Sequence, residues 1–128
     1  MSIESLLIRQ AELSDLRREL KTQGSRELDK CERQRKDVST LGFVDSENCI
    51  SSVFQGWKDE VSESAMYHCS GPDFEATWED AVLEGDVCRH CQNVRALKKQ
   101  RAQAGRELGG VRAAITRVGR RLAKERAA

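Results

Sequence analysis

Aromatic residues, proline and histidine are all scarce in this sequence. Among its 128 residues there are two Trp, one Tyr, three Phe, two His and a single proline, Pro72. So few aromatic side chains exclude a large globular core, whereas a hydrophobic content of 38% is too high for a fully disordered chain. The lack of proline, together with long segments rich in Ala, Glu, Lys, Leu and Arg, favours long helices that bury a narrow apolar stripe.

Long apolar runs are absent as well. No stretch of about 18 apolar residues occurs, so the sequence predicts no membrane-spanning helix. The first residues, MSIESLLIRQAEL, lack the basic start and the continuous apolar stretch of a signal peptide. We therefore expect a cytoplasmic protein with no membrane partner. In a reducing compartment its five cysteines are more typical of metal ligands than of disulfides.

Catalytic motifs are also missing. The sequence contains no phosphate-binding glycine loop, no G-x-S-x-G and no H-E-x-x-H. Both histidines, His68 and His90, adjoin cysteines, which leaves little material for general base chemistry. The carboxylates between residues 73 and 86 are typical of a solvated helix surface. We expect neither enzymatic activity nor a small-molecule substrate.

Charge of one sign is concentrated in particular segments, although the net charge is only +1. Residues 1–36 hold nine basic and seven acidic side chains. Residues 37–94 hold two basic and twelve acidic side chains, and residues 95–128 hold eleven basic and two acidic ones. The centre is therefore strongly acidic and the last segment strongly basic, which points to charged partners.

Both ends of the chain predict long helices. Residues 2–37 have Ser2 as a plausible N-cap and apolar side chains at spacings of mostly three and four. These are Ile3, Leu6, Leu7, Leu13, Leu16, Leu20, Leu28 and Cys31. Gln10, Arg17 and Gly24 lie on or beside this stripe and weaken it, and Gly24-Ser25 is a candidate position for a kink or a short break.

The second long helix is predicted over residues 90–126, where the pattern is clearer. Steps of three and four alternate for four heptads, which is the spacing of a coiled-coil seam. The seam consists of Val94, Leu97, Arg101, Ala104, Leu108, Val111, Ile115, Val118 and Leu122. Arg101 is its one polar member.

The predicted fold is mainly α and a single domain, 1–128. Residues 1–37 form an N-terminal arm, residues 38–91 a compact zinc-stapled head of loops and short helices, and residues 92–128 a C-terminal arm. Short helices are expected near 45–57 and 73–84, the second capped by Asp73. The two long helices are expected to pair antiparallel as a helical hairpin; the alternative is a homodimer in which two chains share the seam.

The cysteine spacing carries the most specific chemical signal. Cys88 and Cys91 form a C-x-x-C, which lets two thiolates bind one tetrahedral ion from a tight turn. Cys69 and Cys49 lie about 20 and 40 residues upstream, in the turn-rich centre. We predict a structural Zn²⁺ site made of Cys49, Cys69, Cys88 and Cys91, with His68 as a substitute for Cys49.

The remaining cysteine and histidine have other interpretations. Cys31 lies on the apolar stripe of the first helix and is expected to be a buried small side chain. His90 is expected to face solvent. A redox C-x-x-C would need a βαβ context that this sequence lacks, and ordinary unliganded core cysteines are the other alternative.

The basic last segment predicts a nucleic-acid or partner surface. Its candidate contact residues are Lys98, Lys99, Arg101, Arg106, Arg112, Arg117, Arg120, Arg121 and Lys124. Arginine predominates, which suits bidentate contact with phosphates. No aromatic residue interleaves these side chains, so stacking on single-stranded bases is not expected.

Two adjoining sequence features resemble a known group of proteins. The first is the pair CRHC at residues 88–91, and the second is LKKQRAQAGRELGGVRAAITRVGRRLAK at residues 97–124. Together they resemble small accessory proteins of tailed bacteriophages and prophages, whose ends run as G-x-V/I-[KR]-x-x-I-x-R-x-G-[KR]. The resemblance covers residues 86–124. It implies a viral protein in the cytoplasm of a bacterial host, with Cys88 and Cys91 as metal ligands.

The combined expectation is a non-enzymatic, zinc-binding accessory or regulatory protein that binds nucleic acid or nucleic-acid-processing machinery. The alternative is an inhibitor of a host enzyme or defence system that acts by protein–protein contact. An acidic centre with exposed aromatic side chains would suit this second function, because it matches a basic site on a nucleic-acid enzyme.

Overall fold

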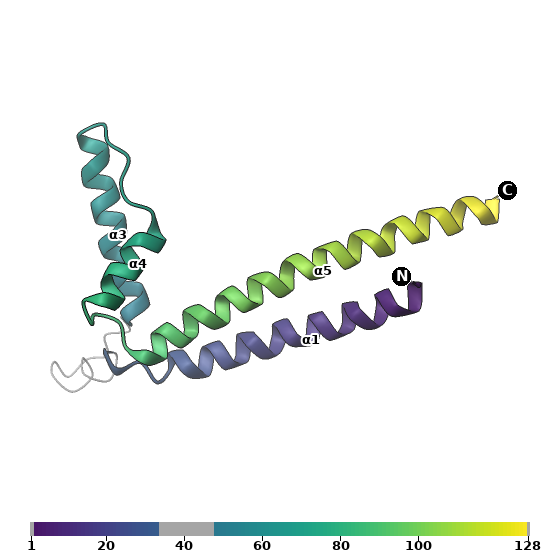
Figure 1. Ribbon diagram of the computed structural model, residues 1–128, viewed down its shortest axis with the longest axis horizontal. Coiled ribbons are helices and arrows are strands. Elements are labelled where there is room, and N and C mark those ends of the chain that lie inside the picture. Colours follow the sequence, from purple (N-terminus) through teal and green to yellow (C-terminus); the bar gives the residue numbers. More distant parts are fainter. Residues whose placement is uncertain (1, 34–47, 128) are drawn as a thin grey trace. The chain divides into compact units, whose positions relative to one another are not determined.

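The computed structural model describes residues 2–33 and 48–127, and this part of the chain is almost entirely helical. Figure 1 shows α1 (Ile3–Leu28), α3 (Cys49–Met66), α4 (Phe74–Leu83) and α5 (Arg89–Ala127), with no strand in the described ranges. The predicted mainly-α class is confirmed. Packing divides the chain into two compact units: residues 1–24 with 96–128, here the hairpin unit, and residues 25–95, here the head unit.

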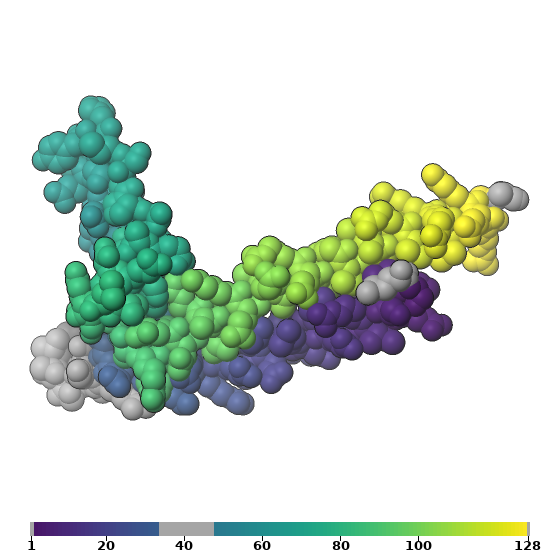
Figure 2. Space-filling model, in the orientation of Figure 1, coloured from purple at the N-terminus to yellow at the C-terminus, as the bar shows by residue number. Residues whose placement is uncertain are grey.

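The hairpin unit consists of α1 and α5 running antiparallel. Leu13, which is 1% exposed, packs with Ala104 and Leu108 in one buried cluster. Nearer the start of α1, Arg9 pairs with Glu107 at 2.9 Å. Figure 2 shows the side chains of the two helices lying against each other along this unit. The long helices therefore pair within one chain, as the hairpin prediction states.

The seam predicted for α5 is confirmed by burial. All of its members are buried or half-buried except Leu122, which is 46% exposed. Arg101, the polar member, is half-buried and its Nε has no hydrogen-bond partner. Three- and four-residue spacing over several heptads thus identified the packed face of this helix.

The stripe predicted for α1 is only partly correct. Leu6, Leu13 and Leu20 are buried, one heptad apart. The polar residues between them, Gln10, Arg17 and Gly24, are half-buried and belong to the same seam, whereas Leu7 and Leu16 are exposed. The helix also ends at Leu28 instead of residue 37, and it runs through Gly24-Ser25 without a break.

Gly105 of α5 lies beside Arg17 of α1 in the hairpin unit. A Cβ atom at this position would lie 3.4 Å from Nε of Arg17 and 3.5 Å from its Cζ, which are ordinary van der Waals distances. An alanine would therefore fit here, and the contact does not require glycine. At Gly109, one turn further along, a Cβ would meet nothing within 4 Å.

The head unit holds α3, α4 and the ends of the long helices. Phe74 at the start of α4 contacts Trp57 of α3 edge-on at 5.6 Å, and Nε1 of Trp57 donates to the Pro72 carbonyl at 2.8 Å. Asp73 caps α4 as predicted, because its carboxylate accepts from the Ala76 amide at 2.8 Å. The first short helix is longer than expected, since it continues to Met66 instead of 57.

Two further sequence predictions concern the start of the 45–57 helix and the absence of a membrane-spanning helix. Phe43 and the start of the predicted 45–57 helix lie outside the described residues. Among the helices that the structure describes, none combines the length and the apolar character needed to cross a membrane.

Leu13 gives a direct test of the hairpin seam. Leu13→Ala should lower the free energy of unfolding by about 2–5 kcal/mol, since it leaves a cavity against Ala104 and Leu108. Leu16→Ala is the matched control, because Leu16 is 41% exposed on the same helix and should change stability by less than about 1 kcal/mol. Urea unfolding followed by circular dichroism measures both, and equal effects would contradict the assigned seam.

Candidate metal centre

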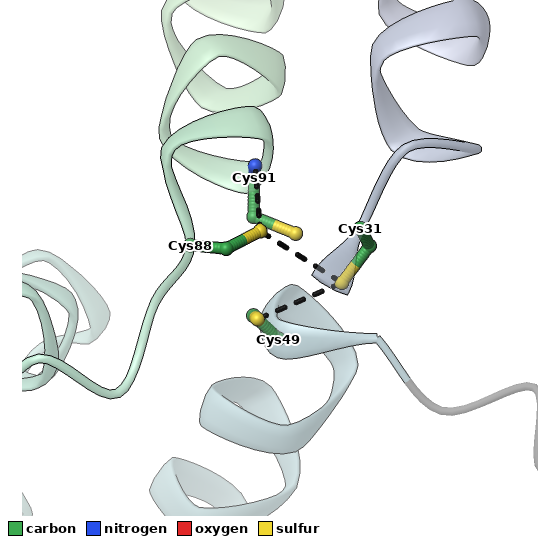
Figure 3. A group of neighbouring side chains, drawn as sticks. All are labelled: Cys31, Cys49, Cys88 and Cys91. Carbon is green, nitrogen blue, oxygen red and sulfur yellow. Dashed lines mark hydrogen bonds between the residues drawn. The ribbon is translucent and has the colours of Figure 1, made fainter. Parts of the chain in front are cut away.

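Four cysteines converge in the head unit, and they come from three different helix ends. Cys31 follows the C-terminus of α1, Cys49 is the first residue of α3, Cys88 precedes α5 and Cys91 lies in its first turn. Their sulfur atoms all lie within 4.8 Å of one another (Figure 3). This arrangement can hold a metal ion.

The sulfur spacing matches a tetrahedral centre. The Sγ atoms of Cys31 and Cys49 are 3.6 Å apart, and those of Cys31 and Cys88 are 3.9 Å apart. Four sulfurs at about 2.3 Å from one ion in tetrahedral geometry would lie about 3.8 Å from each other. The other sulfur pairs lie within 4.8 Å of one another, so the four side chains are close to the spacing that coordination requires.

The cluster is also the core of the head unit. Cys31 and Cys91 have no exposed surface, and Cys49 is 3% exposed. They pack with Trp78 and Val87, the other buried residues of this core. Burial raises the pKa of the Cys91 and Cys49 thiols, and the neighbouring thiols raise it further. Four thiolates this close together require a cation between them, which is the condition a metal ion meets.

The sulfur cluster lies at the N-termini of two helices, α3 and α5. The Cys91 amide donates to Sγ of Cys88 at 3.5 Å. The start of α3 is fixed by Asn48, whose side chain accepts from the Ser51 amide at 2.9 Å and so places Cys49 in the first turn. The positive ends of both helix dipoles favour thiolate charge at this place.

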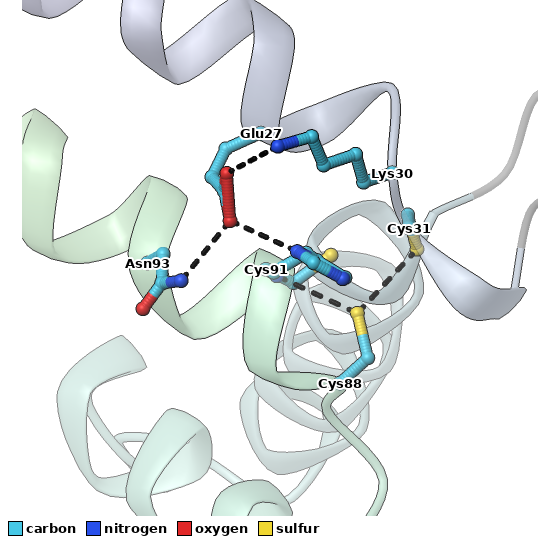
Figure 4. A network of polar contacts seen from close by, with 7 residues as sticks. Glu27, Lys30, Cys31, Cys88, Cys91 and Asn93 are labelled. Carbon is cyan, nitrogen blue, oxygen red and sulfur yellow. Dashed lines mark hydrogen bonds and ion pairs between the residues drawn. The ribbon is translucent and has the colours of Figure 1, made fainter.

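A polar network lies beside the cluster and joins the end of α1 to the start of α5. One oxygen of Glu27 accepts from Nδ1 of His90 at 2.9 Å and from the Asn93 amide at 3.0 Å. The other oxygen accepts from Lys30 at 3.4 Å (Figure 4). The hydrogen bonds from His90 and Asn93 lower the pKa of Glu27 to about 2, so this residue is a carboxylate throughout the neutral range.

The predicted ligand Cys69 is not part of the cluster, and Cys31 takes its place. Cys69 is exposed and donates to the Tyr67 carbonyl at 3.4 Å. The reason is the length of α3: its 18 residues rise about 27 Å from Cys49, so the residues that follow its C-terminus lie far from its start. The sequence prediction assumed a helix ending near 57, which would have kept Cys69 closer.

The two histidine predictions are also corrected. His68 follows the same distant end of α3, in a left-handed conformation with φ of 58°, and cannot substitute for Cys49. His90 was expected to face solvent, but its side chain is only 20% exposed because it is bonded to Glu27. The sequence does contain a signal for Cys31 as a ligand. Cys31 lies at the end of the apolar stripe, and a cysteine that is buried there can also bind a metal ion.

The structure places the predicted basic residues of α5 on its surface. Eight of the nine are exposed, and the exception is Arg101 in the seam. Burial lowers the pKa of a further arginine, Arg95, whose guanidinium lies over Phe74 at 4.7 Å and over Trp78 at 5.1 Å and also pairs with Glu75. Arg95 thus belongs to the head unit.

Comparison with protein-family models, with curated proteins and with solved structures finds no match to this chain. The cysteine cluster and the charged surfaces are therefore the features from which a function can be inferred.

Substituting cysteines one at a time separates the observed ligand set from the predicted one. The unchanged protein should bind about one metal ion per chain, and Cys31→Ser should greatly reduce this binding, because it removes one of the four clustered sulfurs. Cys69→Ser is the matched control and should retain the metal. Native mass spectrometry of both variants measures this, and loss of metal in the Cys69 variant alone would contradict the geometry.

The raised thiol pKa values predict how metal binding depends on pH. Because burial keeps Cys49 and Cys91 protonated when no ion is bound, binding must release protons, and affinity should fall as the pH is lowered. Calorimetric titration in two buffers of different protonation enthalpy measures the protons released. An affinity that does not change between about pH 6 and pH 8 would speak against thiolate ligands.

Proposed function

We propose that the cysteine cluster is a structural zinc centre. The support is the agreement between the sulfur separations of 3.6 and 3.9 Å and the roughly 3.8 Å that a Zn²⁺–thiolate tetrahedron requires. Four sulfur ligands suit zinc, and they leave no coordination position for water or substrate. In this proposal the ion holds the head unit together and takes part in no reaction, so the protein is not an enzyme.

We further propose that the protein binds the phosphate backbone of nucleic acid through the outer face of α5. The observation that carries this proposal is a stripe of five exposed basic residues, four of them on the side away from α1 and the fifth, Arg117, also lining a pocket beside Leu6 of α1. At about 100° per residue, they fall within roughly 60° of the helix circumference, opposite the buried seam. The stripe consists of Lys99, Arg106, Arg117, Arg120 and Lys124.

The dimensions and charge of the hairpin unit support the same function. The stripe covers 26 residues of one helix, from Lys99 to Lys124, which corresponds to about 37 Å. The hairpin unit has fourteen basic and six acidic residues, a net charge of +8, whereas the head unit has eight basic and fifteen acidic residues, a net charge of −7. The net positive charge of the hairpin unit favours phosphate contacts that do not depend on base sequence.

In the setting that the sequence resemblance implies, the protein is a phage-type accessory protein acting on nucleic acid in a bacterial cytoplasm. The competing function is inhibition of a host protein. A pocket of about 560 Å³ in the head unit favours it, because Glu60, Asp80, Glu84 and Asp86 contribute to its lining. Such a surface would suit a basic partner.

Duplex binding titrated with salt tests the nucleic-acid function. The affinity should fall steeply as salt rises, because bound phosphates release counterions. Arg120→Ala combined with Lys124→Ala should weaken binding and lower the slope of log affinity against log salt by about 1.8, if each residue contacts one phosphate. Fluorescence anisotropy of a labelled duplex measures both quantities.

The matched control removes the same two charges from the other helix. Arg18→Ala combined with Lys21→Ala changes one exposed arginine and one exposed lysine of α1, and should leave the salt slope almost unchanged. If both double variants lose affinity equally, the contact is not specific to α5. If the unchanged protein binds no duplex even at low salt, the nucleic-acid function is wrong and the inhibitor function becomes the better one.

A further inference from the structure

Glu27 occupies an unusual place for an acidic residue, next to a cluster of four sulfurs. Its side chain is only 19% exposed, and both of its oxygens are engaged. An ionised carboxylate can only accept hydrogen bonds, so Nδ1 of His90 must donate to it, as the Asn93 amide does. Figure 4 shows Glu27 between its partners, close to the cysteines.

The partners of Glu27 lie on both sides of a cysteine. His90 immediately precedes Cys91 and Asn93 follows it by two residues, so a single carboxylate oxygen is bonded on either side of that ligand. The same carboxylate therefore fixes the first turn of α5, which also carries the bond from the Cys91 amide to Sγ of Cys88.

Hydrogen bonds also fix the position of Glu27 relative to Cys31. The chain leaves α1 in a tight turn in which the Lys30 amide donates to the Glu27 carbonyl at 3.1 Å and the Cys31 amide donates to the Leu28 carbonyl at 3.0 Å. Lys30 also bonds the Glu27 side chain from this turn. Glu27 thus connects the turn that carries Cys31 with the turn that carries Cys88 and Cys91.

We propose that Glu27 is a positioning residue of the metal centre, which sets the distance between Cys31 and the C-x-x-C pair and thereby determines the metal affinity. The proposal rests on the proposed zinc centre. In many proteins, residues just outside the metal ligands orient those ligands through hydrogen bonds. Their loss typically weakens metal binding by about 10- to 100-fold.

Electrostatics alone predicts the opposite effect, which makes the proposal easy to test. A zinc ion with four thiolates carries a net charge of −2, so a nearby carboxylate repels it. If the charge of Glu27 were its main influence, Glu27→Gln would strengthen metal binding. If positioning dominates, the same change weakens binding, because a neutral amide oxygen accepts the hydrogen bonds of His90 and Asn93 less strongly.

The experiment compares Glu27→Gln with Glu19→Gln in the full-length chain. Glu19 is an exposed residue of the same helix and bonds only to Gln23 among the described contacts, at 3.2 Å. Zinc affinity is measured by competition with a chromophoric chelator, and cobalt(II) reports the geometry through its tetrahedral absorption bands. We expect about 10- to 100-fold weaker zinc binding and altered cobalt bands for Glu27→Gln, and no change for Glu19→Gln.

Asn93→Ala provides a second variant that leaves the glutamate in place. It removes one of the two bonds from α5 at an exposed residue and should weaken zinc binding about 3- to 10-fold with unchanged helicity. If Glu27→Gln does not fold, unchanged affinity in the Asn93 variant overturns the proposal and weaker affinity supports it.

The outcomes separate this proposal from the zinc centre on which it rests. If Glu27→Gln binds zinc as tightly as the unchanged protein, or more tightly, with the same cobalt bands, the positioning role is wrong and the zinc centre stands. If the unchanged protein binds neither zinc nor cobalt, the zinc centre itself is wrong.

Discussion

The convergence of three helix ends on one group of sulfur atoms is the constraint on which the head unit depends. Cys31, Cys49 and Cys91 account for three of the five buried residues in its core, and the other apolar side chains packed there are only partly buried apart from Trp78 and Val87. Thiols can pack as small apolar groups, but they contribute little buried area. A metal ion at this place would supply free energy that the apolar contacts cannot, about 10–16 kcal/mol in small zinc domains.

The cluster also explains why the head unit tolerates so much negative charge. Its acidic residues repel one another, and a metal ion that joins α1, α3 and α5 would hold those elements together against this repulsion. The hairpin unit has the opposite charge and its own apolar contact of Leu13 with Ala104 and Leu108. A phosphate backbone would therefore be attracted to the hairpin unit and repelled by the head unit, which is consistent with the outer face of α5 as the proposed contact surface.

The sequence predicted most of the fold, and it failed where polar residues take structural positions. The seam of α5 was recognisable because its members are apolar apart from Arg101. The seam of α1 was obscured by Gln10, Arg17 and Gly24, which hold heptad positions without being apolar. Spacing indicates which positions face a partner helix, whereas hydrophobicity indicates only the positions filled by apolar contacts.

In the cysteine cluster, one pair of ligands is identified by the local sequence, whereas the choice of the other ligands depends on distant parts of the chain. The pair Cys88 and Cys91 is a local motif, and its role in the cluster could be read from the sequence. The choice between Cys31 and Cys69 depends on where α3 ends, and helix boundaries are weakly encoded. Nothing between residues 57 and 66 ends the helix, because no proline or glycine interrupts that stretch.

The heptad spacing of α1 places Glu27 of the metal centre at the end of the seam. Steps of three and four from Ile3 continue through Gly24 to Glu27, which is the last seam position before α1 ends at Leu28. Cys31 follows in the turn after the helix end. Inserting one residue between Glu27 and Cys31 would lengthen this turn and shift the thiol relative to the carboxylate, while leaving every apolar seam position upstream in place. The ligand geometry therefore depends on the length of the turn, and the hydrogen bonds of Glu27 to His90 and Asn93 fix the helix end from which the turn starts.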